Sequence, residues 1–330
     1  MHLYRSLNEF IEKRTFSAAP PVVTVGSFDG VHLGHQYLMN ELIEWAGELE
    51  ASPLVITFHT HPRTFMTGEE IKRITPIEQK LVLLRELGIR EVLLLDFDEG
   101  VRDTTAFDFC REFLIDGLKA QGLLIGHNNR IGKGREGTPE SLQAFGKEVG
   151  FAVRIAEKVE VGGLPISSSA IRDHIESGDF LWSRKMLGRP YGILSTVAKG
   201  KQLGRTIGFP TINLSLSGIC HPPLGVYGVR VELLPDSGDP DAAPERYIGA
   251  ANIGLRPTVE DAKEPLLEVH LIDYEGDCYG RLARVIFHFK LRDEEKFAGL
   301  DALKAQLASD VAETRRRFDA ASESGRMPGV

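Results

Sequence analysis

Short runs of almost wholly apolar residues recur through the first half of this chain, and their spacing restricts the folds it can adopt. The runs alternate with stretches that have the apolar period of a helix, and they cover residues 22–26, 54–58, 91–97, 122–126 and 151–156. Strands that are apolar along their whole length are buried on both faces, as in a parallel sheet covered by helices. The pattern predicts a Rossmann-like α/β domain, in which ligands bind beyond the carboxyl ends of the strands.

Beyond residue 188, short strand-like pieces separated by turn residues replace this alternation. They cover residues 191–197, 211–214, 226–233, 246–251, 266–274 and 283–289. Such spacing predicts a small antiparallel β-barrel. A final helix over 294–318 would place several apolar side chains on one face and pack on the barrel, namely Phe297, Leu300, Leu303 and Leu307. We therefore predict two domains, 1–184 and 185–330.

The composition excludes several classes of partner. The chain has 39 Lys and Arg against 47 Asp and Glu, a net charge of −8 that repels polyanions. We expect no nucleic-acid partner, no membrane association, no secretory signal and, if any, only transient self-association. Three cysteines without a CxxC pair fit a reducing compartment. The sequence thus predicts a cytoplasmic enzyme.

A glycine-rich segment with two histidines, GSFDGVHLGHQ (26–36), follows the first predicted strand. His32 and His35 are three residues apart at a helix start, so both side chains reach the same side of its N-terminus. Helix N-termini attract phosphate, and two imidazoles there could hydrogen-bond a nucleoside triphosphate. The spacing alone leaves a metal site or a plain capped turn open. The glycines that let a ligand approach the backbone are Gly26, Gly30 and Gly34.

A serine-rich segment, ISSSAIRDHIESGD (166–179), opens another predicted helix late in the first domain. Ser167 and Ser168 offer an N-cap and hydroxyl donors, and Arg172 extends a guanidinium across the first turn. The segment therefore suits an anion, although a well-capped helix is the alternative if it stands alone.

The second domain contains a third candidate segment, GKQLGRTIGFPTIN (200–213), without a P-loop or protein-kinase motif. Its glycines form a flexible loop able to close over phosphates, and they are Gly200, Gly204 and Gly208. Thr211 and Asn213 lie on one side of a strand by its period of two. Hydroxyl and amide oxygens suit Mg²⁺ held mainly by ATP, whereas the alternative is a Gly/Pro turn leading into a strand.

Together these segments resemble the bacterial bifunctional riboflavin kinase/FMN adenylyltransferase family, often called FAD synthetase. HxGH with SSSxxR resembles the adenylyltransferase half, and GRTIGFPTIN, GVYGV, NIGLRPT, LEVHL and LRDEEKF resemble the kinase half. The resemblance implies an α/β Rossmann-like nucleotidyltransferase domain followed by a riboflavin kinase-like barrel with a C-terminal helix. The barrel would phosphorylate riboflavin with ATP to give FMN. The first domain would join FMN to AMP from a second ATP, giving FAD and pyrophosphate, and both steps would use Mg²⁺.

In the adenylyltransferase half, the resemblance implies that His32 and His35 hold the ATP phosphates. Ser167, Ser168 and Arg172 would hold the leaving pyrophosphate. Further nucleotide contacts would come from Gly26, Phe28, Asp29, Gly30 and Gly34.

Two more segments of this half bear on the flavin. FHTHP (58–62) resembles a family string and retains His61, and GHNNRIGKGREG (126–137) matches another at Asn128 and Arg130. Asn129 and Ile131 stand where the family has aromatics. Phe65 is therefore the aromatic residue that we expect to stack on the flavin beside His61, with Asn128 in the catalytic set.

In the kinase half, the resemblance makes Glu268 the general base for the riboflavin 5′-hydroxyl. It places Arg292 and Phe297 at the flavin and Thr211 and Asn213 at the metal. ATP contacts would come from Gly200, Gly204, Arg205, Gly208 and Pro210. An exposed strand carboxylate and an ordinary surface ion pair are the alternatives for Glu268 and Arg292.

Two rival functions stay open. A riboflavin kinase with an adenylyltransferase weakened by Asn129 and Ile131 would accumulate FMN without FAD. A non-catalytic flavin sensor would bind flavin and turn over no ATP. Both sets of catalytic residues are present, which favours the bifunctional enzyme.

Overall fold

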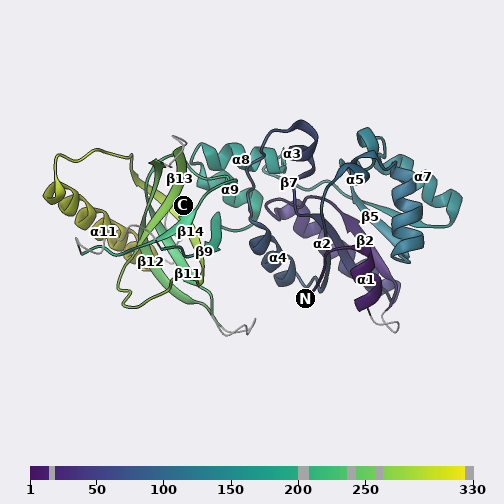
Figure 1. Ribbon diagram of the computed structural model, residues 1–330, viewed down its shortest axis with the longest axis horizontal. Helices are drawn as coiled ribbons and strands as arrows, with labels where there is room; N and C mark the ends of the chain where they lie inside the picture. Colours follow the sequence, from purple (N-terminus) through teal and green to yellow (C-terminus); the bar gives the residue numbers. More distant parts are fainter. Residues whose placement is uncertain (15–18, 200–207, 236–242, 258–262, 324–330) are drawn as a thin grey trace. The chain divides into compact units, whose positions relative to one another are not determined.

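The computed structural model describes residues 1–14, 19–199, 208–235, 243–257 and 263–323. The chain forms two compact units (Figure 1). Unit 1 comprises Met1–Ile71 and Lys80–Ser167, and unit 2 comprises Lys72–Gln79 and Ser168–Val330. The division after residue 184 concerns the two activities and stays a prediction.

Unit 1 is built on a six-stranded sheet whose strands all pair in parallel. In spatial order the strands are β1 (His2–Tyr4), β4 (Glu91–Leu95), β3 (Ser52–Phe58), β2 (Pro21–Val25), β5 (Gly122–Gly126) and β6 (Ala152–Ala156). The predicted α/β class is confirmed, and β1 is an addition to it. From β2 the chain proceeds outward to β3 and β4 and then returns to β5 on the other side of β2. The crevice beyond β2 and β5 is thus the switch point at which such sheets bind ligands.

Helices cover both faces of this sheet, which explains why its strands are apolar throughout. On one face Leu42 and Trp45 of α2 pack over Val55 and Val92, and on the other Leu114 packs with the opposite side chains of the same strands. The longer helices are α1 (Leu7–Lys13), α2 (Leu33–Glu48), α4 (Ile77–Glu86), the π-helix η1 (Phe109–Gly117) and α7 (Pro139–Val149). The shorter elements are α3 (Pro62–Thr67), α5 (Glu99–Asp103), α6 (Ala106–Asp108), η2 (Lys133–Arg135), β7 (Glu160–Val161) and β8 (Leu164–Pro165).

Unit 2 contains an antiparallel six-stranded sheet, which confirms the predicted barrel. In spatial order its strands are β10 (Thr211–Ser215), β13 (Lys263–Leu271), β12 (Glu245–Pro257), β11 (Gly225–Leu233), β14 (Leu282–Arg292) and β9 (Gly192–Thr196). An isolated bridge between Ala198 and Asn213 links the chain after β9 to β10, so the barrel is nearly closed. Its interior is filled by large side chains such as Tyr227 and Phe287, both at most 2% exposed.

The described helices that lie wholly in unit 2 are α8 (Ser168–Glu176), α9 (Phe180–Leu187) and the C-terminal α11 (Leu300–Glu323), which packs on β11, β12 and β14 (Figure 1). The predicted start of the last helix at residue 294 is wrong, because residues 293–299 are not helical. Gly299, a poor helix former, directly precedes the helix and leaves Phe297 in the loop before it. None of the described helices is long and apolar enough to cross a membrane.

Candidate functional site

The loop after β2 holds an unusual backbone. Phe28 has φ 47° and Val31 has φ 40°, on either side of Gly30 with φ 87°. Left-handed conformations at residues other than glycine cost about 1–3 kcal/mol each and cluster at functional sites. Phe28, Asp29 and Val31 are buried, so packing holds the loop in place. Gly26 is required because a Cβ there would lie 2.9 Å from the Phe28 ring.

The histidine pair begins α2, where the sequence predicted it. His32 is the N-cap, and its Nδ1 accepts a hydrogen bond of 3.3 Å from the backbone N–H of His35. The two rings stack with centroids 3.6 Å apart, and the Phe28 ring meets that of His35 edge-on at 5.3 Å. The alternative of a plain capped turn describes His32 only in part, because the cap also stacks on a second imidazole. This helix end presents N–H groups and a positive dipole end, which favour an anion.

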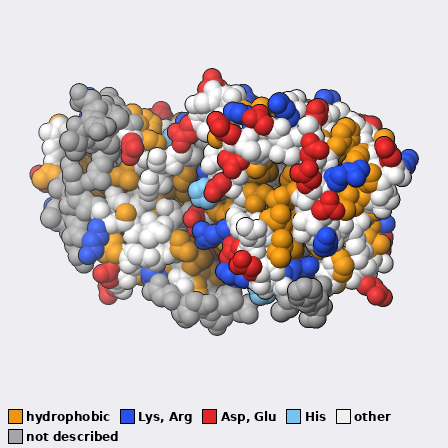
Figure 2. Space-filling model, turned by 45° about the vertical axis from the view of Figure 1, so that its right-hand side comes forward, with side chains coloured by type: hydrophobic (Ala, Val, Ile, Leu, Met, Phe, Trp, Pro, Cys, Tyr) orange, Lys and Arg blue, Asp and Glu red, His pale blue; other side chains and the backbone are white. Residues whose placement is uncertain are grey.

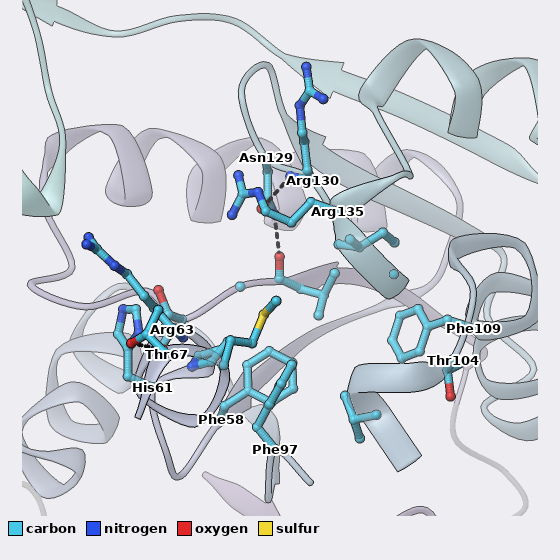
Figure 3. Close-up of a pocket in the computed structure, with 18 residues that line it drawn as sticks. Phe58, His61, Arg63, Thr67, Phe97, Thr104, Phe109, Asn129, Arg130 and Arg135 are labelled. Atoms are coloured by element: carbon cyan, nitrogen blue, oxygen red, sulfur yellow. Dashed lines mark hydrogen bonds between the residues drawn. The ribbon is translucent and has the colours of Figure 1, made fainter. Parts of the chain in front are cut away.

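Unit 1 contains a cavity of about 440 Å³ beside this loop (Figure 3). It lies at the carboxyl ends of the strands, because Gly26 and Ser27 follow β2, Phe58 ends β3 and Asn129 follows β5. Its aromatic side chains are Phe58, Phe97 and Phe109, and its cationic side chains are Arg63, Arg130 and Arg135. The position agrees with the switch point of the sheet. A cavity that combines apolar rings with guanidinium groups suits a planar ligand that carries an anionic group.

Of the two residues that the sequence predicts at this flavin, one lines the cavity and the other does not. His61 lines the cavity, and its Nδ1 accepts a hydrogen bond from Arg63 N at 3.2 Å. Phe65 is not among the lining residues, and its ring packs at 5.6 Å on Phe97. Phe97 and Phe109 were missed. Phe97 follows the carboxyl end of β4, so the rule that ligands bind beyond the carboxyl ends of the strands could have indicated it. Nothing in the sequence indicates the π-helix that begins at Phe109.

The loop between β5 and α7 is hydrogen-bonded to β2, the strand that precedes the histidine loop. Asn129 Nδ2 donates to Val25 O at 2.8 Å, and its Oδ1 accepts from Arg130 N at 2.9 Å. Ile131 exchanges backbone hydrogen bonds of 3.0 and 3.1 Å with Gly137. Asn129 and Ile131 therefore shape the loop, while Asn128 is exposed and not among the residues lining the cavity.

The serine-rich segment divides between the two units. Ser167 ends unit 1, and Ser168 begins α8 of unit 2. Within unit 2, Arg172 Nε donates to Lys72 O at 2.8 Å. The joint role of these residues with the histidines stays a prediction. A metal site at the histidines finds no support within the described ranges, where no group of three His, Cys, Asp or Glu side chains could hold an ion.

The strand register of unit 2 gathers the kinase candidates. Glu268 of β13 lies opposite Asn213 of β10 on one side and opposite Asn252 of β12 on the other, and Thr211 lies opposite His270. Directly opposed residues of antiparallel strands have their side chains on the same face. The predicted base and the predicted metal ligands therefore share one face of the barrel. Glu268 is partly buried.

Asn213 carries the most informative atom of this face. The side chain is 5% exposed, and its Oδ1 is buried without a hydrogen bond among the described residues. A buried oxygen left without a partner costs about 1–3 kcal/mol, so the position suits a ligand that the oxygen can contact.

The segment before β10 is only partly described. Gly200, Gly204 and Arg205 lie outside the described residues, and Gly208 has φ 88°. Pro210 O pairs with His270 Nδ1 at 2.9 Å, which holds the start of β10 against β13.

A second cavity, of about 270 Å³, adjoins this face. It is lined by Pro210, Thr211, Ile212 and Leu271, and by the loop of residues 274–279. Burial, with a smaller contribution from Cys278, raises the pKa of Tyr274 in this loop to about 12. The loop is not among the predicted site segments, although its Gly276 and Asp277 mark a turn between two strands.

Arg292 and Phe297 lie together at the end of β14. The Arg292 guanidinium is 5.6 Å from the centre of the Phe297 ring and contacts Asp310 Oδ2 at 2.9 Å. Asp310 lies on α11 and is 4% exposed, whereas Arg292 is partly buried, so the pair is not an ordinary surface ion pair. Contact of Arg292 and Phe297 with a flavin stays a prediction.

Comparison with known proteins gives matches over both units. A family model described as FAD synthetase matches residues 16–170, and one described as riboflavin kinase matches residues 187–318. Relatives named bifunctional riboflavin kinase/FMN adenylyltransferase are 39% identical in Pseudomonas fluorescens and 34% identical in Bacillus subtilis. These matches cover 89% and 91% of this chain and 92% and 93% of the relatives.

A solved structure has a similar fold over most of the chain. It is a Streptococcus pneumoniae chain described as a macrolide-efflux protein, with a TM-score of 0.77 and 28% identity. The match covers 95% of this chain and 98% of that one.

Proposed function

The chain belongs to the bifunctional riboflavin kinase/FMN adenylyltransferase family, and we propose which of its residues carry each of the two reactions. It is a transferase that phosphorylates riboflavin and adenylylates FMN. The observation that carries the assignment in unit 1 is the stacked pair of His32 and His35 beside an aromatic cavity at the switch point of the sheet. In unit 2 it is Glu268, flanked on one face by two asparagines.

For adenylyl transfer, we propose that FMN occupies the 440 Å³ cavity. The isoalloxazine would stack among Phe58, Phe97 and Phe109, which offer the apolar rings that a planar ligand needs. Phe65 would support Phe97 from behind. His61 would contact the flavin at the edge of the same cavity.

The histidines would act on the ATP phosphates. A phosphate oxygen of FMN attacks the α-phosphorus of ATP, the bond to the β-phosphate oxygen breaks, and pyrophosphate leaves as FAD forms. The attacking phosphate is already an anion, so this step needs positioned donors rather than a covalent nucleophile of the chain. His32 and His35 would stabilise the charge that develops on the phosphates, with Ser167, Ser168 and Arg172 holding the pyrophosphate.

For riboflavin phosphorylation, Glu268 would take the proton of the 5′-hydroxyl as its oxygen attacks the γ-phosphorus and ADP leaves. The adenine nucleotide would bind in the 270 Å³ cavity, because Thr211 belongs both to its lining and to the face that carries Glu268. Arg292 and Phe297 would bound the flavin site.

The residues of this face fit Mg²⁺. The buried Asn213 Oδ1 needs a partner, the Thr211 hydroxyl lies on the same face, and both are hard oxygen ligands. We propose that these two side chains hold the ion together with phosphate oxygens of ATP. When bound, it would neutralise charge on the phosphates. The same ion chemistry would accompany adenylyl transfer in unit 1.

The partners we propose are riboflavin, FMN and ATP. Acidic and basic side chains are interspersed on the face that Figure 2 shows, and the net charge of −8 disfavours nucleic acid. We propose a cytoplasmic enzyme whose self-association, if any, is transient.

A chromatographic time course tests the proposal. We expect riboflavin, ATP and Mg²⁺ to give FMN that then becomes FAD, and FMN supplied at the start to give FAD directly. FMN that never becomes FAD would mean that unit 1 is inactive and would support the kinase-only alternative. No product from either substrate would overturn both assignments in favour of a flavin sensor.

A further inference from the structure

Lys80 is a buried lysine of unit 1 and is not among the predicted site residues. The side chain is 4% exposed, although an ammonium group is costly to remove from water. Its Nζ donates to Ser27 O at 2.7 Å and to Thr57 Oγ1 at 3.1 Å. The Thr57 hydroxyl in turn donates to Ser27 O at 3.2 Å. A helix residue and a strand residue therefore converge on one backbone carbonyl.

That carbonyl opens the strained loop that leads to the histidines. The loop runs from Ser27 to the N-cap His32, and three of its residues have a left-handed backbone. They are Phe28, Gly30 and Val31. At the far end of the loop, Gln36 Nε2 donates to Val31 O at 2.8 Å. Side chains thus fix both ends of a segment whose backbone stores strain.

The position of Lys80 also matters electrostatically. Ser27 lines the cavity in which FMN is proposed to bind, and its carbonyl oxygen accepts a hydrogen bond from the Lys80 ammonium. Charges in a low-dielectric interior interact more strongly than in water. A cation held behind the loop would therefore favour the anionic phosphates that the loop receives, without touching them.

We propose that Lys80 is a positioning residue for adenylyl transfer. It holds Ser27 O, and through it the loop, so that His32 and His35 meet the ATP phosphates. Thr57 shares this task through its hydroxyl. The proposal rests on the assignment of FMN adenylylation to unit 1.

Substitution of Lys80 by Met tests the proposal in the full chain. Met has a similar length but neither charge nor donor. Since a displacement of about 1 Å costs on the order of 10²-fold in rate, we expect kcat for FAD formation from FMN to fall ~10²-fold in Lys80→Met. The KM for FMN should change little, because the cavity rings are untouched. Riboflavin phosphorylation by the same molecule should keep its wild-type rate.

Two further variants sharpen the test. Thr57→Val keeps the shape of the side chain but removes its hydroxyl, and we expect a smaller loss in kcat, of roughly tenfold. Lys147→Met removes an exposed lysine of α7 in the same unit and should leave both activities unchanged.

The possible outcomes separate the hypotheses. FAD formation within threefold of wild type in Lys80→Met would overturn the proposal. Loss of FMN binding in Lys80→Met would overturn it too, because Lys80 would then support only the fold of the unit. FMN binding is measured in the absence of ATP by the quenching of flavin fluorescence. If the wild-type chain itself makes no FAD from FMN, the function proposed for unit 1 fails instead.

Discussion

The two units position their reacting groups by different means. In unit 1 the candidate groups lie on loops that follow parallel strands, and a strained backbone held by a few side chains sets their direction. In unit 2 they lie on the strands themselves, and the register of β13 with β10 and β12 places them opposite one another. A loop site therefore depends on local contacts, whereas a register site depends on pairing along whole strands. Because both occur in one chain, each activity serves as the internal control for the other.

The largest effect on a reaction rate is expected for substitution of Glu268, on the face of the barrel that carries the kinase candidates. In Glu268→Gln the side chain keeps its shape but cannot accept a proton, so FMN formation from riboflavin should fall roughly 10²–10⁴-fold. FAD formation from FMN should be unchanged. Glu264→Gln, an exposed position on the same strand, is the control. FMN formation near the wild-type rate in Glu268→Gln would show that Glu268 is not the general base.

The loop of unit 1 should give the converse result. His32→Ala removes both the N-cap and one of the stacked rings, and FAD formation should fall on the order of 10²–10³-fold while FMN formation persists. His32→Asn separates the two roles, because Asn is a good N-cap without an imidazole. We expect it to remain slow in a steady-state assay of FAD formation. Full activity in His32→Asn would reduce His32 to a helix cap.

A smaller effect is expected at the aromatic cavity. Phe109→Leu removes a ring but keeps an apolar side chain, and the KM for FMN should rise about two- to tenfold. Phe107→Leu, two residues earlier and 42% exposed, should leave that KM unchanged. Steady-state kinetics of FAD formation measure both variants. Equal KM values in wild type and Phe109→Leu would place the flavin elsewhere.

The smallest effect concerns stability at alkaline pH. Burial raises the pKa of the Cys110 thiol from 9.0 to about 12. Above pH 9 the unfolded thiol therefore loses its proton while the folded one keeps it, so the free energy of unfolding falls as pH rises. The slope is at most about 1.4 kcal/mol per pH unit. Urea unfolding at pH 8 to 10 should show a shallower decline for Cys110→Ala, and equal slopes would contradict the assignment.

Much of the fold could be predicted because it depends on apolar periodicity. The buried strands of unit 1 are apolar on both faces, and that pattern is visible without any tertiary information. The strand β1 was missed because His2–Tyr4 is too short to show a period. The last helix begins later than predicted because the apolar period extends back to Phe297, whereas Gly299 sets its start.

The sites were predictable in part, for a related reason. The histidine pair and the segment around Thr211 are contiguous in sequence, so local spacing indicates them. The meeting of Asn213, Asn252 and Glu268 depends on the spatial order of three strands, which no local pattern contains. Lys80 was missed for the same reason, because its ammonium contacts Ser27 O and Thr57 Oγ1, which are far from it in sequence.

The π-helix that begins at Phe109 makes the cavity sensitive to chain length. A π-helix carries more residues in each turn than an α-helix, so its side chains point in directions that an α-helix of the same sequence would not give. Deleting one residue from Phe109–Gly117 would let the segment rewind as an α-helix and rotate Phe109 relative to Leu114, which is anchored in the core. An insertion or deletion here could therefore alter the cavity proposed for FMN while every residue that lines it keeps its identity.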